Sequence, residues 1–195
     1  MRYSPRTMPA ASLLRRRDFH RTLGSAALAG LAMAGCSAPG AQDFEQLWTR
    51  LRGIAVGRAS ADQRLAVFFD TRCGYCRQLW QELAPVQDQL LVLWTPVAIL
   101  APASRNQALG LLASANPAQA LSAHMRGRAR LPDAEGAPSL EAALDGNLAA
   151  LESLPGASRS VPQIAGLRHQ ALQVVRGAAP LAHLQQQFAL STPAR

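Results

Sequence analysis

The feature of this chain that most constrains its fold is a strand-like apolar run followed almost at once by two cysteines. Residues 65–69 (LAVFF) form a continuous apolar stretch between polar neighbours, which is typical of a strand buried on both faces. After polar residues 70–72, Cys73 and Cys76 open a segment in which Trp80 and Leu83 recur at helical spacing. The sequence therefore predicts a cysteine pair at the start of a helix that follows a central strand.

Two cysteines separated by two residues can attach haem, hold zinc, form a passive disulfide or carry out thiol redox chemistry. Covalent haem attachment needs a histidine directly after the second cysteine, and this chain has Arg77 there. A structural zinc site needs about four ligands, but no second cysteine pair or closely spaced histidine pair accompanies the CGYC motif. Redox chemistry is the favoured interpretation, with zinc and a passive disulfide as weaker alternatives.

The position of each motif residue suggests its role. Cys73 would lie at the helix N-terminus, where unpaired N–H groups and the helix dipole stabilise a thiolate, and Arg72 would add positive charge. We expect Cys73 to be the nucleophile and Cys76, one turn further in, to be the resolving thiol. Gly74 would let a substrate chain approach, and Tyr75 would offer it an apolar face.

The rest of the pattern alternates between strands and helices and predicts an α/β fold. The expected elements are a strand at 90–94, a helical stretch at 105–125 interrupted at Asn116-Pro117, a loop at 126–138, one helix or two around Gly146 at 140–154, strands at 163–167 and 170–175, and a helix at 180–190. Asp70 is interpreted as a turn and cap residue, Trp80 as core, and His124-Met125 as a surface pair rather than a metal site.

Residues 1–35 have the form of an export signal. Arg16-Arg17-Asp18-Phe19 resembles a twin-arginine signal, and the apolar run at 23–34 is shorter than the roughly 20 residues that cross a bilayer. Met33-Ala34-Gly35-Cys36 resembles a lipobox, so lipidation is expected at Cys36. The alternative is ordinary cleavage nearby, with Cys36 left as a free or disulfide-bonded thiol.

The charge pattern excludes one class of function. The formal net charge is +8, all 20 basic residues are arginines, and six of them precede residue 36. The later arginines show no continuous basic run and are spread among nearly as many carboxylates. A nucleic-acid-binding protein would show a clustered basic stripe, so we expect no nucleic-acid partner.

Between the leader and the motif lies a small-residue tether and a short amphipathic helix. Phe44, Leu47, Trp48 and Leu51 recur at helical spacing before Gly53. Residues 36–60 are therefore interpreted as a tether and linker helix, and residues 61–195 as the catalytic domain. We expect the apolar helix face to pack on that domain, with a dimer or partner contact as the alternative.

Residues 67–76 (VFFDTRCGYC) resemble the active-site segment of the thioredoxin superfamily, and more narrowly that of the periplasmic DsbC/DsbG disulfide isomerases. Residues 94–100, Asn116-Pro117-Ala118 and Val161-Pro162 are similar to the DsbG branch, so the resemblance covers residues 62–190. It implies a thioredoxin fold with a helical insertion between the second strand and the cis-proline strand. It also implies that Pro162 is the cis-proline, which lies opposite the cysteines, keeps a backbone edge open for an extended substrate and blocks metal capture by the thiols.

Two departures from the family pattern bear on activity. Val161 stands where this branch usually has threonine, which removes a hydroxyl beside the sulfurs and would shift substrate preference or redox potential. Only residues 42–57 are available where the isomerases carry a dimerisation domain. A monomeric, membrane-tethered reductase or oxidase therefore fits as well as an isomerase.

The combined expectation is a periplasmic, lipid-anchored thiol-disulfide oxidoreductase of the isomerase or reductase type. Its partners would be cysteine-containing envelope proteins and a membrane thiol-disulfide redox partner, with no metal and no cofactor beyond the redox-active disulfide. The alternatives are a purely oxidising thiol oxidase and a thioredoxin-fold copper(I) carrier that adds Met125 or a histidine to the two thiols. The residues expected to contact substrate are Gly74, Tyr75, Val161 and Pro162.

Overall fold

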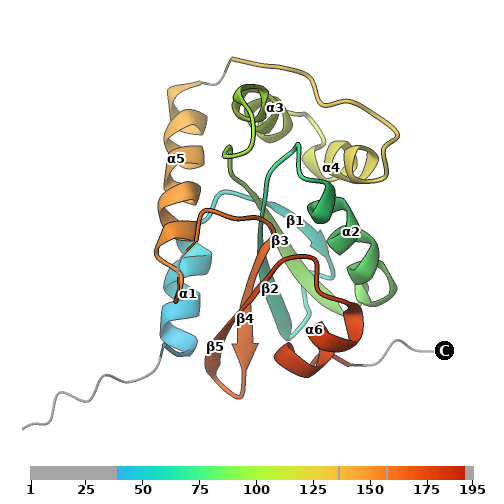
Figure 1. Cartoon of the computed structure of the whole chain (residues 1–195), viewed down its shortest axis with the longest axis vertical. Helices are drawn as coiled ribbons and strands as arrows, with labels where there is room; N and C mark the ends of the chain where they lie inside the picture. Colours follow the sequence, from blue (N-terminus) through green and yellow to red (C-terminus); the bar gives the residue numbers. More distant parts are fainter. Residues whose placement is uncertain (1–38, 136, 157, 192–195) are drawn as a thin grey trace, which may run out of the picture. The chain divides into compact units, whose positions relative to one another are not determined.

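The computed structural model describes residues 39–135, 137–156 and 158–191. The export signal and Cys36 lie outside these residues. Within the described part of the chain, no helix is both long enough and apolar enough to cross a membrane. The strands form one sheet in the order β1-β3-β2-β4-β5 (Figure 1), with bounds β1 Ile54–Gly57, β2 Gln63–Phe69, β3 Leu90–Pro96, β4 Gln163–Arg168 and β5 Ala171–Arg176.

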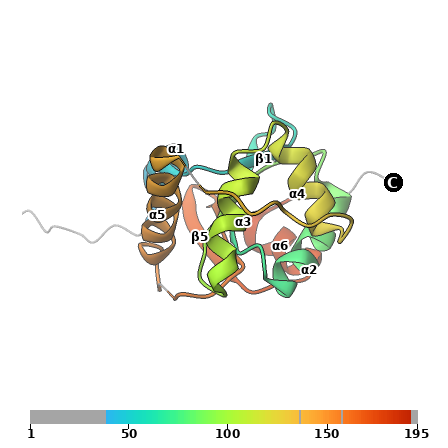
Figure 2. The ribbon, with the colours of Figure 1, turned by 90° about the horizontal axis from the view of Figure 1, so that it is seen from above.

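Helices cover both faces of the sheet. They are α1 Ala41–Arg50, α2 Gly74–Leu83, α3 Pro102–Leu112, α4 Pro117–Met125, α5 Pro138–Glu152 and α6 Leu181–Phe188, with a 3-10 turn, η1, at Ala84–Val86. Helices α1 and α5 lie on one side, and α2, α4 and α6 lie on the other (Figures 1 and 2). The predicted helical insertion is confirmed as α3 to α5, between β3 and β4.

Strand β2 is buried on both faces, as its apolar sequence predicts. It pairs in parallel with β3 and antiparallel with β4. Because side chains alternate along a strand, Leu65, Val67 and Phe69 pack with the core that includes α2, α4 and α6, whereas Ala66 and Phe68 pack with α1 and α5. Since β2 ends at Phe69, the turn and the two cysteines emerge from the middle of the sheet.

Strand β1 corrects the interpretation of residues 36–60 as a tether and linker helix. It is an edge strand of the sheet and pairs antiparallel with β3. At its end Gly57 has a φ of +107°, and a Cβ there would come within 2.1 Å of the Leu90 carbonyl oxygen, so glycine is required. A four-residue edge strand has too few positions to show a periodic pattern, which explains why it was not predicted.

Helix α1 packs on the main domain, which was the favoured expectation for this amphipathic segment. Phe44 and Leu47 are buried in the same cluster as Phe68 of β2 and Leu151 of α5. The Gly40 N–H donates to Asp43 Oδ2 at 2.7 Å at the start of the helix. The apolar face of α1 is therefore part of the core of the domain.

Two boundaries within the insertion follow from local chemistry. Asn116 Oδ1 accepts the Gln119 N–H at 3.1 Å, and Pro117 occupies the first turn of α4, so the predicted interruption before α4 is confirmed. Residues 138–152 form a single helix, and Gly146 lies inside it without ending it.

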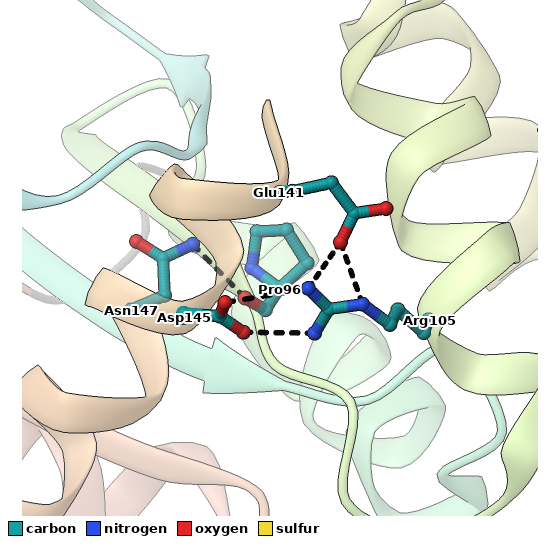
Figure 3. A network of polar contacts seen from close by, with 5 residues as sticks. All are labelled: Pro96, Arg105, Glu141, Asp145 and Asn147. Atoms are coloured by element: carbon teal, nitrogen blue, oxygen red, sulfur yellow. Dashed lines mark hydrogen bonds and ion pairs between the residues drawn. The ribbon is translucent and has the colours of Figure 1, made fainter. Parts of the chain in front are cut away.

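A polar network fastens α3 and α5 to the end of β3 (Figure 3). Arg105 of α3 forms ion pairs with Glu141 and Asp145 of α5, and its Nη1 lies 2.8 Å from Asp145 Oδ1. The fully buried Asn147 of α5 donates its amide to the Pro96 carbonyl at 3.0 Å. These contacts hold the insertion beside the end of the sheet from which the cysteines emerge.

Candidate active site

The first cysteine caps helix α2. Cys73 has extended backbone angles, and its Sγ accepts the Cys76 N–H at 3.1 Å. Its own N–H donates to the Asp70 carbonyl at 3.0 Å, which closes the turn after β2. The sulfur therefore occupies the position at which a helix N-terminus stabilises negative charge.

The environment separates the two thiols. A hydrogen bond from the Cys76 side chain and backbone N–H donation from Cys76 and Tyr75 lower the pKa of Cys73, although burial and the Asp70 carboxylate oppose them. Burial, the Cys73 hydrogen bond and the Cys73 charge raise the pKa of Cys76 well above its usual range. Cys73 is thus prepared to act as a thiolate while Cys76, which is fully buried, keeps its proton.

A second segment, remote in sequence, reaches Cys73 from the neighbouring strand, because Val161 and Pro162 lead into β4, where Gln163 pairs with Phe68 at the end of β2. The Val161–Pro162 peptide bond is cis, and Cys73 Sγ lies 3.7 Å from the Val161 carbonyl oxygen, within reach of a bond from the thiol. The Gln163 side chain donates to the Ser158 and Ser160 carbonyls at 2.7 and 3.0 Å, which secures the segment that leads into β4. Residues separated by 88 positions in the chain thus meet at the sulfur.

Asp70 does more than cap the turn. Its Oδ1 accepts the Arg72 N–H at 2.8 Å and the Ser104 hydroxyl at 2.7 Å. Its Oδ2 accepts the Ile99 and Leu100 N–H groups at 2.8 and 3.0 Å. The predicted turn role is correct, but the carboxylate is buried and also ties the active-site turn to the connection between β3 and α3. That connection is remote in sequence, so no local pattern predicts its contacts with Asp70. The only sequence signal is that an acidic residue stands just before the cysteine motif.

The helical insertion supports the same turn through Thr71. His124 Nε2 lies 2.8 Å from the Thr71 carbonyl oxygen, and the Thr71 hydroxyl donates to Gln107 Oε1 at 3.1 Å. The interpretation of His124-Met125 as a surface pair is wrong, because both side chains are buried. Both residues lie on the buried face of α4 together with Leu121. The two-residue pair by itself gives no indication of this face.

The other motif residues occupy distinct environments. Tyr75 is 69% exposed, and Arg72 is also exposed. Trp80 is buried, and its ring centroid lies 5.1 Å from that of Trp94, so the prediction that Trp80 is a core residue is confirmed. A Cβ on Gly74 would meet no atom within 4 Å, which leaves its surface open to an approaching chain. Among the described residues, no group of three or more His, Cys, Asp or Glu side chains is arranged to hold a metal ion.

The opposite pKa shifts predict a maximum in the stability of the reduced protein with pH. Between the lowered pKa of folded Cys73 and about 8.5, the value of a free thiol, the unfolded chain binds more protons, so stability rises by up to about 1.4 kcal/mol per pH unit. That contribution is lost as pH falls through the folded pKa of Cys73. Above about 8.5 the folded chain retains the Cys76 proton that the unfolded chain releases, so stability falls again.

Urea unfolding of the reduced and oxidised proteins across this pH range measures the effect, since the oxidised protein lacks both thiols. Ultraviolet thiolate absorbance gives the Cys73 pKa directly, and it should rise in Cys76→Ala, which removes the side-chain donor. A native midpoint at or above that of a free cysteine would contradict the prediction.

The sheet order, the insertion and the cysteine pair at the start of α2 together define a thioredoxin-like fold with a dithiol site. A periplasmic thioredoxin-like protein from Salmonella enterica serovar Typhimurium aligns with a TM-score of 0.60 at 18% identity, over 74% of this chain and 94% of that one. The catalytic domain of Proteus mirabilis ScsC aligns with a TM-score of 0.61 at 16% identity, over 77% and 97% of the two chains.

The thiol-disulfide exchange protein alpha-DsbA2 from Wolbachia pipientis aligns with a TM-score of 0.56 at 13% identity, over 74% of this chain and 90% of that one. No protein-family model and no curated protein matches the chain. At these identities the similarity shows the fold alone, and the narrower resemblance to the DsbC/DsbG isomerases stays a prediction.

Proposed function

We propose that this protein is a thiol-disulfide oxidoreductase of the cell envelope that exchanges disulfides with other proteins through Cys73 and Cys76. The observation that carries the proposal is the placement of Cys73 Sγ, which accepts the Cys76 N–H at 3.1 Å and lies 3.7 Å from the Val161 carbonyl. One contact favours a thiolate, and the other brings the Val161 backbone next to the sulfur, which supports the proposal that an extended substrate chain binds along it.

In the reducing direction, the Cys73 thiolate attacks one sulfur of a substrate disulfide. A disulfide forms between Cys73 and that sulfur, and the other substrate sulfur leaves as a thiolate. Cys76 then loses its proton to the leaving thiolate and attacks the Cys73 sulfur, which closes the internal disulfide and releases the second substrate thiolate. Two electrons pass from the dithiol to the substrate, and the buried Cys76 reacts only within the protein.

We place this protein with the reducing or isomerising enzymes rather than with purely oxidising ones, on the basis of the resemblance of residues 67–76 to the DsbC/DsbG segment. Helix α1 and strand β1 belong to the catalytic domain itself and do not form a separate substrate-holding module. Reduction of substrate disulfides is therefore proposed ahead of isomerisation, and Gly74, Tyr75, Val161 and Pro162 are proposed as substrate contacts.

The proposed location is the periplasm, with the chain exported through a twin-arginine-like signal and tethered to the membrane by lipidation at Cys36. One structural neighbour supports the location, since the Salmonella protein is described as a periplasmic thioredoxin-like protein. A membrane thiol-disulfide protein would recharge the Cys73-Cys76 pair, and cysteine-containing envelope proteins would be the substrates.

The function is tested by insulin-disulfide reduction with the purified, reduced protein, alongside its equilibrium reduction potential. We expect catalysed reduction of insulin, and a potential nearer the thioredoxin end of the scale, about −270 mV, than the DsbA end, about −120 mV. Stoichiometric copper binding without insulin reduction would overturn the enzyme assignment in favour of a copper(I) carrier.

A further inference from the structure

A cavity of about 800 Å³ opens beside the cysteine pair, and the reaction proposed above does not use it. Its walls come from the active-site turn, α2, α3, α4 and the connection between α4 and α5. Arg72 precedes Cys73 in the chain and Arg77 follows Cys76, so the cavity flanks the motif. Its charged lining side chains are Arg72, Arg77, Arg128, Arg130 and Asp133.

The cavity carries an excess of positive charge within the described part of the chain. The ion pairs there involve Arg64, Arg105 and Arg159, and none of the four cavity arginines forms one. The buried His124 also lines the cavity, and its pKa is lowered first by burial and then by the charges of Arg77 and Arg72, against the Thr71 hydrogen bond. Four guanidinium groups thus face one carboxylate, Asp133.

The loop that carries two of the arginines is held against the fold. The Arg128 N–H donates to the Ala123 carbonyl at 2.8 Å, and the Ala134 N–H donates to the Asn106 carbonyl at 3.2 Å. Leu131 between them is buried. A Cβ on Gly110 of α3 would come within 2.1 Å of the Pro132 carbonyl oxygen, so the loop backbone lies directly on α3. The backbone that carries Arg128 and Arg130 is therefore held in place by contacts with α3 and α4.

We propose that this cavity binds carboxylate side chains of the substrate polypeptide close to the cysteine that reacts with Cys73. The proposal rests on the proposed function and names its substrate class: disulfides flanked by acidic residues. Guanidinium groups suit carboxylates because they can form two parallel charge-assisted hydrogen bonds. A positive field beside the nucleophile also raises the rate of encounter with an acidic segment, and added salt weakens the effect.

A polypeptide fits better than a small anion because the ligand has to extend from the Cys73 sulfur to the arginines of the cavity. An extended chain advances about 3.3 Å per residue, so residues a few positions from the reacting cysteine reach past the motif into the cavity. The Val161 carbonyl oxygen lies 3.7 Å from the same sulfur, and the exposed Tyr75 lies two residues after Cys73, so both would supply the remaining contacts of an extended segment.

The test measures how fast the reduced protein attacks two peptides that carry the same thiopyridyl mixed disulfide. One peptide has Asp and Glu flanking its cysteine, and the other has Asn and Gln at those positions. We expect the acidic peptide to react about tenfold faster at low ionic strength, with the ratio falling as salt is added. Arg128→Gln/Arg130→Gln should bring the ratio close to one.

The matched control is Arg58→Gln/Arg168→Gln, which removes the same charge from two exposed arginines that form no ion pair within the described residues. Arg168 ends β4, and β4 runs antiparallel to β2, so this residue lies at the end of the sheet opposite Phe69. The control should keep the native ratio of the two rates.

Equal rates for the two peptides with the native protein would overturn the proposal while leaving the proposed function intact, whereas no reaction with either peptide would overturn both. A third arm uses glutathione disulfide, a small anionic disulfide that carries two carboxylates in each half. If its rate alone depends on Arg128 and Arg130, the cavity serves small anionic disulfides and the polypeptide proposal is wrong.

Discussion

Replacement of Cys73 by Ser is expected to lower disulfide exchange by at least about a thousandfold, because a serine hydroxyl is not ionised at neutral pH and is a far weaker nucleophile than a thiolate. Cys76→Ser has a different expected result. Cys73 in that variant still attacks substrates, but no buried thiol remains to resolve the mixed disulfide. Mixed disulfides with envelope proteins should therefore accumulate and be visible on non-reducing gels of cells expressing Cys76→Ser.

Cys36 provides the control, since it is the one further cysteine of the chain. The adducts of Cys76→Ser should persist when Cys36 is also replaced by Ala and should disappear in Cys73→Ser/Cys76→Ser. Adducts that depend on Cys36 and not on Cys73 would show that the nucleophile has been assigned wrongly.

Asp70→Ala is expected to lower the free energy of unfolding by about 3–5 kcal/mol. The substitution removes the acceptor of four hydrogen bonds and leaves three backbone N–H groups and the Ser104 hydroxyl without this partner at a buried position. The loss is large against the 5–15 kcal/mol that stabilises most domains. Urea unfolding of the oxidised protein measures it without interference from thiol ionisation.

Asp62→Ala is the matched control, because Asp62 is exposed and forms no ion pair or side-chain hydrogen bond within the described residues. Its effect should stay within about 0.5 kcal/mol. Asp70→Asn retains one acceptor oxygen, should fold with an intermediate loss, and should lower the Cys73 pKa because the Asp70 charge raises it. If Asp70→Ala costs no more than Asp62→Ala, the carboxylate does not hold the site together.

The sequence predicts those elements whose buried residues or end signals form a local pattern along the chain. The apolar run of β2 needs two covered faces wherever it lies, so residues 65–69 indicated a central strand without knowledge of its neighbours. Asn116 and Pro117 act within one helical turn, so the interruption before α4 was also visible. Strand β1 was missed because its pairing with β3, and not its own composition, makes it a strand.

The sequence indicates only one part of the basic cavity. Arg126, Arg128 and Arg130 alternate with Gly127 and Ala129, so they form no continuous basic run. The fold brings two of them together with Arg72 and Arg77, which lie about 50 positions earlier in the chain. The alternating arginines of the loop therefore indicate one half of the cavity but not the other.

The sequence by itself determined the reactive pair, the helix that it opens and the strand before it, because all three depend on contacts between residues a few positions apart. Only the tertiary structure decided what surrounds Cys73. The Val161 carbonyl reaches the sulfur from 88 residues away, the Asp70 carboxylate bonds to the connection after β3, and His124 supports the turn from α4. Only folding brings these groups together, because they are far apart in the sequence and a local pattern says nothing about contacts between distant residues.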